Sequence, residues 1–96
     1  MPTKQNLSEL LYGEVKSKET IDLIFSDLEN QILDKREITL DLKNVSFISV
    51  YFLERLERFV EKAKKLSVEI KIINVSPEIY KVFQVGRAKN ILDRCC

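Results

Sequence analysis

The chain has 96 residues, of which 45% are hydrophobic, so it suits one globular domain and is too apolar for a disordered protein. Sixteen basic residues against fifteen acidic ones leave a net charge of +1, which gives no electrostatic attraction to nucleic acid or to an anionic membrane. No apolar run is long enough to span a bilayer, and residues 1–9 lack the apolar segment of a signal peptide, so we expect a cytoplasmic protein.

In the first half of the chain, residues 9–16 indicate a strand, although their leucines also fit a short helix together with Leu7. Ser17 is a predicted N-cap, and the helix that follows should run to about Leu33 with the apolar stripe Ile21, Ile24, Phe25, Leu28 and Ile32. Residues 37–43 alternate between apolar and polar side chains, which is typical of a half-buried strand. A turn at Asn44 and a short apolar segment, residues 45–48, come next.

The second half repeats the pattern. An amphipathic helix is predicted from about Phe52 to Leu66, and an alternating strand over residues 68–74. Ser76 then precedes Pro77, a combination that marks a helix start, and this short helix should end near Gly86. Residues 88–92 favour one more helical turn.

The order of strands and helices predicts an α/β fold with a small, mainly parallel sheet, because helical crossovers connect parallel strands. Two of the strands carry polar side chains at every second position, so one face of the sheet should be wet and the helices should pack on the other face. We expect a single domain over residues 1–96, with residues 1–8 and 93–96 frayed.

Catalytic chemistry has little support in this sequence. The chain has no histidine, no glycine-rich phosphate loop and no G-x-S-x-G motif, so we expect no catalytic site, no metal site and no cofactor. Cys95 and Cys96 are adjacent, and adjacent cysteines neither staple a core nor complete a zinc site. They indicate free thiols on a frayed tail, with an intermolecular disulfide or a redox contact as the alternative.

Residues 40–56, LDLKNVSFISVYFLERL, resemble the core signature of the STAS family, L-D-L-x-x-V-x-F-I-D-S-[ST]-G-L, which runs from a strand into a helix. The matching residues are Leu40, Asp41, Leu42, Val45, Phe47, Ile48 and Leu53. The resemblance continues at residues 11–15, 74–79 and 82–86 and implies a STAS-like fold over about residues 9–92. The family includes bacterial anti-sigma factor antagonists, domains of sulfate transporters and small subunits of lipid-trafficking ABC transporters.

The sequence departs from this family at the loop that carries its phosphorylation switch. Antagonists of the family are phosphorylated on the serine or threonine that follows the loop aspartate. Here Ser49 stands at the aspartate position, Val50 at the acceptor, Tyr51 at the next hydroxyl and Phe52 at the glycine. Valine has no hydroxyl, so the usual switch cannot operate at Val50. Ser49 or Tyr51 could replace the acceptor, or Ser49 could be an N-cap and Tyr51 a packed aromatic. Phe52 either plugs the helix–strand junction or joins an exposed docking patch.

The resemblance implies a non-catalytic interaction module whose partner is another protein, an anti-sigma kinase-like factor or a transporter subunit. The predicted partner-binding residues are Asn44, Ser46, Ser49, Val50, Tyr51, Phe52, Glu54 and Arg55. One alternative is an antagonist phosphorylated at Ser49 or Tyr51, and a second is the STAS subunit of an ABC lipid transporter. A third is a small-ligand sensor at the helix starts near Ser49 and Ser76. The short N-terminal strand leaves a sheet edge exposed, which allows a homodimer. Neither nucleic-acid binding nor membrane insertion is expected.

Overall fold

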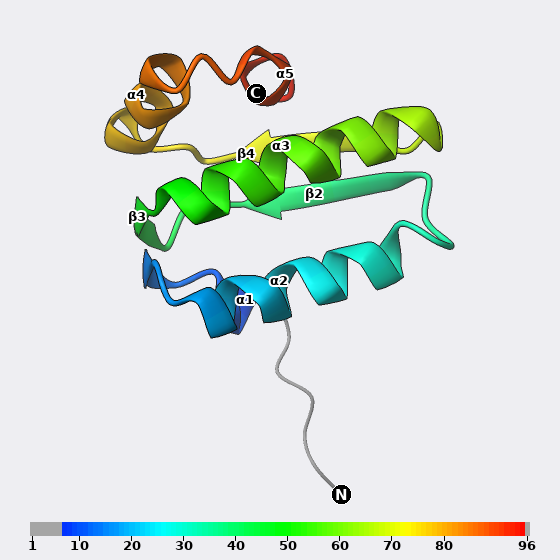
Figure 1. The fold of residues 1–96 in the computed structure, drawn as a ribbon, viewed down its shortest axis with the longest axis horizontal. Helices are drawn as coiled ribbons and strands as arrows, with labels where there is room; N and C mark the ends of the chain where they lie inside the picture. Colours follow the sequence, from blue (N-terminus) through cyan, green and yellow to red (C-terminus); the bar gives the residue numbers. More distant parts are fainter. Residues whose placement is uncertain (1–6, 96) are drawn as a thin grey trace, which may run out of the picture.

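In the computed structural model, which describes residues 7–95, short strands alternate with helices along the chain (Figure 1). The elements are α1 (Leu7–Leu10), β1 (Gly13–Val15), α2 (Lys18–Gln31), β2 (Glu37–Asp41), β3 (Val45–Ile48), α3 (Val50–Lys65), β4 (Glu69–Ile73), α4 (Pro77–Val85) and α5 (Lys89–Leu92). The prediction of an α/β domain with mainly parallel strands is confirmed.

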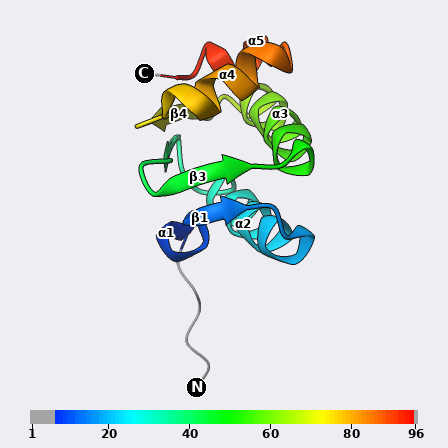
Figure 2. The same ribbon diagram turned by 90° about the vertical axis from the view of Figure 1, so that its left-hand side faces the viewer.

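The strands form two parallel pairs. β2 pairs with β4 over its whole length, from Glu37 opposite Glu69 to Asp41 opposite Ile73, and β1 pairs with β3. Between the pairs the chain turns: the Leu42 amide still donates to the carbonyl of Ile73 at 3.0 Å, and β3 then runs across the end of the β2–β4 pair (Figures 1 and 2). The expected small sheet is therefore split, because this turn redirects the segment after β2 toward β1.

Three serines cap the three longer helices. The hydroxyl oxygens of Ser17, Ser49 and Ser76 accept hydrogen bonds from backbone N–H groups three residues later, at 3.4, 3.2 and 3.3 Å. Each of these bonds satisfies one of the donors that a helix leaves unpaired in its first turn. The predicted N-caps at Ser17 and Ser76 are confirmed, whereas α3 begins two residues earlier than predicted because Ser49 caps it.

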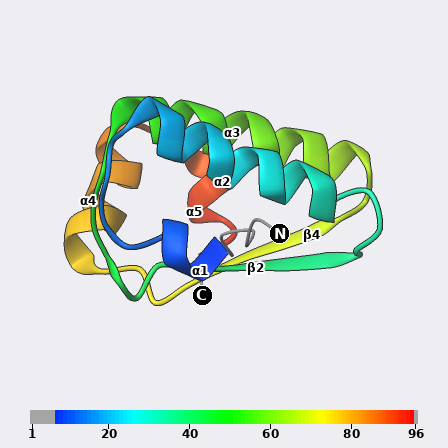
Figure 3. The ribbon, with the colours of Figure 1, turned by 90° about the horizontal axis from the view of Figure 1, so that it is seen from below.

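The helices α2 and α3 lie side by side over the same face of the β2–β4 pair (Figure 3). Apolar side chains of β2, such as Ile38 and Leu40, point into this layer and are buried, while Thr39 between them is exposed. On the exposed face, the Lys71 ammonium lies 3.3 Å from the Glu37 carboxylate. The predicted division of the strands into an apolar and a polar face therefore holds.

Both ends of the described chain differ from expectation. The strand predicted from residue 9 is wrong at its start, because residues 7–10 form helix α1, and the amide of Leu11, just after this helix, donates to the carbonyl of Leu7 at 2.9 Å. At the other end, Ile72 donates to the carbonyl of Arg94 at 2.9 Å and pairs with Cys95. Residues 93–95, which were predicted to fray, are thus held along β4. Residues 1–6 and Cys96 lie outside the described residues.

Candidate functional site

The start of α3 is fixed from two sides by Ser49. Its backbone N–H donates to the carbonyl of Val15 in β1 at 3.2 Å, and its hydroxyl oxygen accepts from the N–H of Phe52. The serine side chain is half-buried, with extended backbone angles that suit an N-cap. Of the two roles predicted for Ser49, the structure places it in the capping role.

Val50 and Phe52 point in different directions. The Val50 side chain is 71% exposed, while Phe52 is fully buried, with its ring centroid 5.4 Å from that of Phe25 in α2. Phe52 therefore leaves the predicted partner-binding surface and acts as the plug of the helix–strand junction. Val50 stays on the surface as an apolar side chain at the position of the family's phospho-acceptor.

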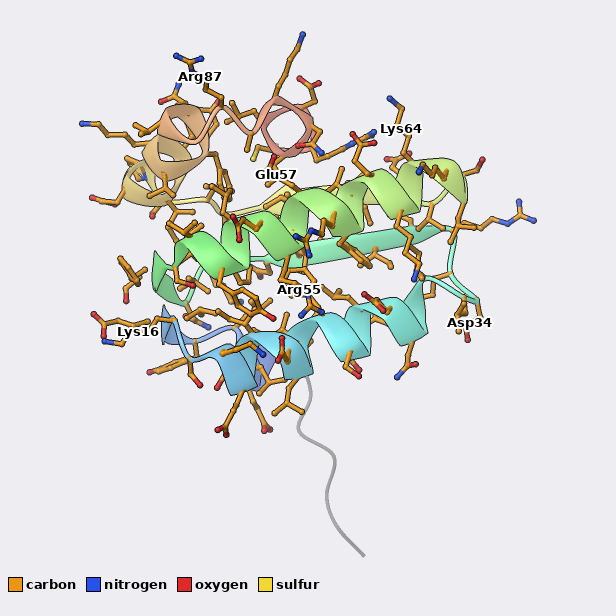
Figure 4. All side chains as sticks on the ribbon, viewed as in Figure 1. Lys16, Asp34, Arg55, Glu57, Lys64 and Arg87 are labelled. Atoms are coloured by element: carbon orange, nitrogen blue, oxygen red, sulfur yellow. The ribbon has the colours of Figure 1, made fainter. Side chains whose placement is uncertain are left out.

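Tyr51 and Arg55 turn toward α2, where they meet Asp22. The Tyr51 hydroxyl donates to Asp22 Oδ1 at 2.5 Å, and Arg55 Nη1 donates to the same oxygen at 2.6 Å and to the Tyr51 hydroxyl at 3.0 Å. Lys18 Nζ lies 3.3 Å from Asp22 Oδ2. Figure 4 shows Arg55 reaching into the space between the two helices. We call these four residues the α2–α3 clasp.

The clasp keeps its carboxylate charged. The hydrogen bond from Tyr51 lowers the pKa of Asp22 below its usual value, and the positive charges of Lys18 and Arg55 act in the same direction. The guanidinium of Arg55 also lies 5.2 Å from the ring centroid of Phe25, so it covers the core at this place. The clasp is a structural joint between α2 and α3 in which the Tyr51 hydroxyl is already engaged.

Sequence analysis missed Lys18 and Asp22, because the clasp joins residues 29 and 33 positions apart. The only local signal was the spacing of Lys18 and Asp22, four residues apart on one helix, which indicates an ion pair but no contact with α3.

The remaining predicted residues are spread over other parts of this end of the molecule. Asn44 and Ser46 are exposed, Asn44 in the turn before β3 and Ser46 on β3 itself, and Glu54 is exposed on α3. The carbonyl of Asn44 accepts from the N–H of Gly13 at 2.8 Å. Since Tyr51 faces α2 and Val50 faces α4, the eight predicted residues do not form one surface.

Beside Val50 lies a hollow that sequence analysis did not predict. This α3–α4 groove has a volume of about 370 Å³, and its lining residues are Val50, Leu53, Glu78, Lys81, Val82, Val85 and Gly86. Val85 is 75% exposed. A Cβ on Gly86 would lie 2.6 Å from Leu53 Cδ2, so a larger residue at this position would displace the Leu53 side chain in the floor of the groove. The buried apolar residues of α4 are Ile79 and Phe83, and Val85 lies outside that buried stripe.

The Asp41 carboxylate lies at the end of the β2–β4 pair, where it bonds to residues that follow both strands. It accepts hydrogen bonds from the Asn74 side chain and from the backbone N–H of Lys43, both at 3.0 Å, and the bond from Asn74 is the main reason why the pKa of Asp41 lies below its usual value. This aspartate, which belongs to the matched signature, therefore holds a turn.

Within residues 7–95, His, Cys, Asp and Glu side chains form no group of three that could hold a metal ion. In the same part of the chain, none of the helices has the length and apolar character needed to cross a membrane. The described site offers an exposed apolar groove beside a helix start, and both features suit contact with another macromolecule.

Comparison with known protein families shows that the STAS domain model matches residues 17–94. The matched segment runs from the N-cap of α2 through α5 and includes the whole start of α3. Comparison with curated proteins and comparison with solved structures gave no match.

Proposed function

Because the chain belongs to the STAS domain family, as its signature at residues 40–56 predicted, we propose that it is a fixed adaptor that binds another protein through the start of α3 and the α3–α4 groove. STAS domains are generally non-catalytic and typically interact with other proteins. The observation that carries the proposal is Val50, an exposed side chain without a hydroxyl at the position of the family's phospho-acceptor.

The neighbouring hydroxyls support a contact that needs no phosphorylation. The Ser49 oxygen already caps α3, and the Tyr51 hydroxyl is bonded within the clasp. A phosphate on Tyr51 would meet the carboxylate of Asp22, and like charges at this distance repel. An apolar groove, in contrast, can bind a partner protein without any covalent modification of this chain.

A second candidate function is a switch at Tyr51. Its supporting observation is the pair of cations beside that hydroxyl, since Lys18 and Arg55 could exchange Asp22 for a phosphate group. The family allows two kinds of partner for either candidate, an anti-sigma kinase-like factor and a transporter subunit. Homodimerisation is a further expectation: among the described residues β2 has a strand partner on one edge only, so a second copy could pair with the other edge.

The proposed function is tested by Val50→Asp in a quantitative pull-down from the native host. Aspartate is favourable in the first turn of a helix, so the variant should fold normally and lose its partner. Leu33→Asp is the matched control, because Leu33 is 77% exposed and lies in the segment that joins α2 to β2, away from the start of α3. Equal recovery of the partner with both variants would remove the start of α3 as the binding surface.

A further inference from the structure

A second hollow of about 700 Å³ lies next to the α3–α4 groove along α3, between α3 and residues 87–93, and the two hollows share no lining residue. The two hollows are neighbours on both walls. On α3, Leu53 of the first hollow is about one helical turn from Glu57 of the second. On the opposite wall, Gly86 of the first directly precedes Arg87 of the second. Figure 4 shows Glu57 between α3 and α5, with Arg87 near the end of α4.

The second hollow is mainly cationic. Three carboxylates line it, those of Glu57, Glu61 and Asp93, and they face the five cations Arg58, Lys62, Lys65, Arg87 and Lys89. Lys62 is paired with Glu29 on α2 at 3.8 Å, whereas the other four cations have no ion pair within the described part of the chain. A ligand that runs along α3 therefore meets apolar side chains first and an excess of positive charge afterwards, which favours carboxylates at that end.

The walls of this composite groove restrict what can bind. They are helices and a helix–helix turn, and the nearby outer edge of β4 is already occupied where Ile72 bonds to Arg94. An added strand has no backbone partner here, so recognition must use side chains, as a helix in a groove does. From Val50 to Lys65 the two hollows follow the sixteen residues of α3, whose fifteen steps of 1.5 Å span about 22 Å, which matches roughly four turns of a bound helix.

We propose that the composite groove binds an amphipathic helix of the partner protein. Apolar side chains of that helix anchor it between Val50 and Val85, and carboxylates about one to two turns further along face Arg87 and Lys89. This inference rests on the proposed function and adds the chemistry of the partner, a helix that is apolar at one end and acidic at the other.

Site-specific photo-crosslinking of the full chain in host cells tests the inference. Benzoylphenylalanine replaces Val50, Val85 or Lys89, one at a time, and the crosslinked partner peptides are identified by mass spectrometry. We expect Val85 and Lys89 to react with one continuous partner segment, Val85 at an apolar residue and Lys89 among acidic residues about four to seven positions away.

The outcomes separate the two proposals. A crosslink from Val50 without a shared acidic segment at Val85 and Lys89 would overturn the helix inference and leave the proposed function standing. Crosslinks to an extended segment, to a lysine-rich segment or to a second copy of this chain would also overturn it. The absence of crosslinks from all three positions would overturn both.

A charge reversal gives a second, quantitative test. Arg87→Glu combined with Lys89→Glu should weaken binding of the crosslinked partner about tenfold at low salt, with a smaller difference at high salt. Lys35→Glu combined with Lys64→Glu changes the net charge of the chain by the same amount, but at positions outside the groove. This control pair should leave the affinity for the partner unchanged. An equal loss of affinity in both double variants would show a general effect of net charge and would contradict binding in the groove.

Discussion

At the scale of single residues, Asp22 holds together the polar contact between α2 and α3. Three side chains bond to its carboxylate, and they lower its pKa chiefly through the hydroxyl of Tyr51. A carboxylate with a lowered pKa stabilises the fold at pH values above its unfolded pKa. That contribution is lost as the pH falls through the folded pKa.

For Asp22→Asn we therefore expect a changed pH dependence. The wild-type chain should lose stability as the pH falls below about 4, and the variant should lose less, because its amide does not titrate. Urea unfolding at neutral and acid pH measures this. Asp34→Asn alters an exposed carboxylate outside the clasp and should follow the wild type. If the stability of Asp22→Asn depended on pH in the same way as that of the wild type, the stabilising role of the clasp would be contradicted.

The opposite environments of Phe52 and Val50 give a second residue-scale prediction. Phe52→Ala should lower the free energy of unfolding by about 3–5 kcal/mol, because it empties a fully buried site beside Phe25. Val50→Ala should change that free energy by less than about 0.5 kcal/mol, since Val50 is mostly exposed. Chemical denaturation compares the two, and similar losses would show that Val50 is also a core residue.

At the scale of elements, Ser49 decides where α3 begins. Ser49→Ala removes the hydroxyl that bonds to the Phe52 amide and should cost about 1 kcal/mol of stability. Ser49→Asp should stay close to the wild type, because aspartate is an equally good cap and its charge suits the helix dipole. Ser46→Ala on β3 is the control, with little change expected. An alanine variant at position 49 with wild-type stability in urea would exclude the capping role.

Elements with local signals could be predicted from the sequence, and those set by distant contacts could not. Ser76 with Pro77 predicted the start of α4, since a cap and a proline act within one turn. The leucines near Leu7 were interpreted as part of a strand, although they also fitted a short helix, and packing in the core decided for α1. The turn at Asn44 was predicted, but the split of the sheet depends on the pairing of β3 with β1, which no periodicity reports.

The candidate site divides in the same way. The signature at residues 40–56 located the start of α3, and the missing hydroxyl at Val50 was visible in the sequence itself. The direction of each side chain was not visible, because it depends on the neighbours of α3 in space. Tyr51 faces α2 and Val50 faces α4. The residues predicted to form one surface are therefore divided between the clasp and the groove.

At the scale of the whole molecule, the two sides of α3 differ in structure. The side toward α2 carries the clasp, which holds the helix layer together. The side toward α4 and α5 carries the composite groove, which is exposed and chemically graded from apolar to cationic. The adaptor that we propose would present a constant surface, so the supply of partners would set how often it is bound.

The most direct test is the phosphorylation state of the chain in its complex. Native purification from host cells in several growth conditions, followed by intact-mass spectrometry of the bound and unbound chain, measures it. We expect the unmodified chain in the complex under every condition. A phosphorylated form at Ser49 or Tyr51 that is depleted from the complex would contradict a fixed adaptor and establish a switch.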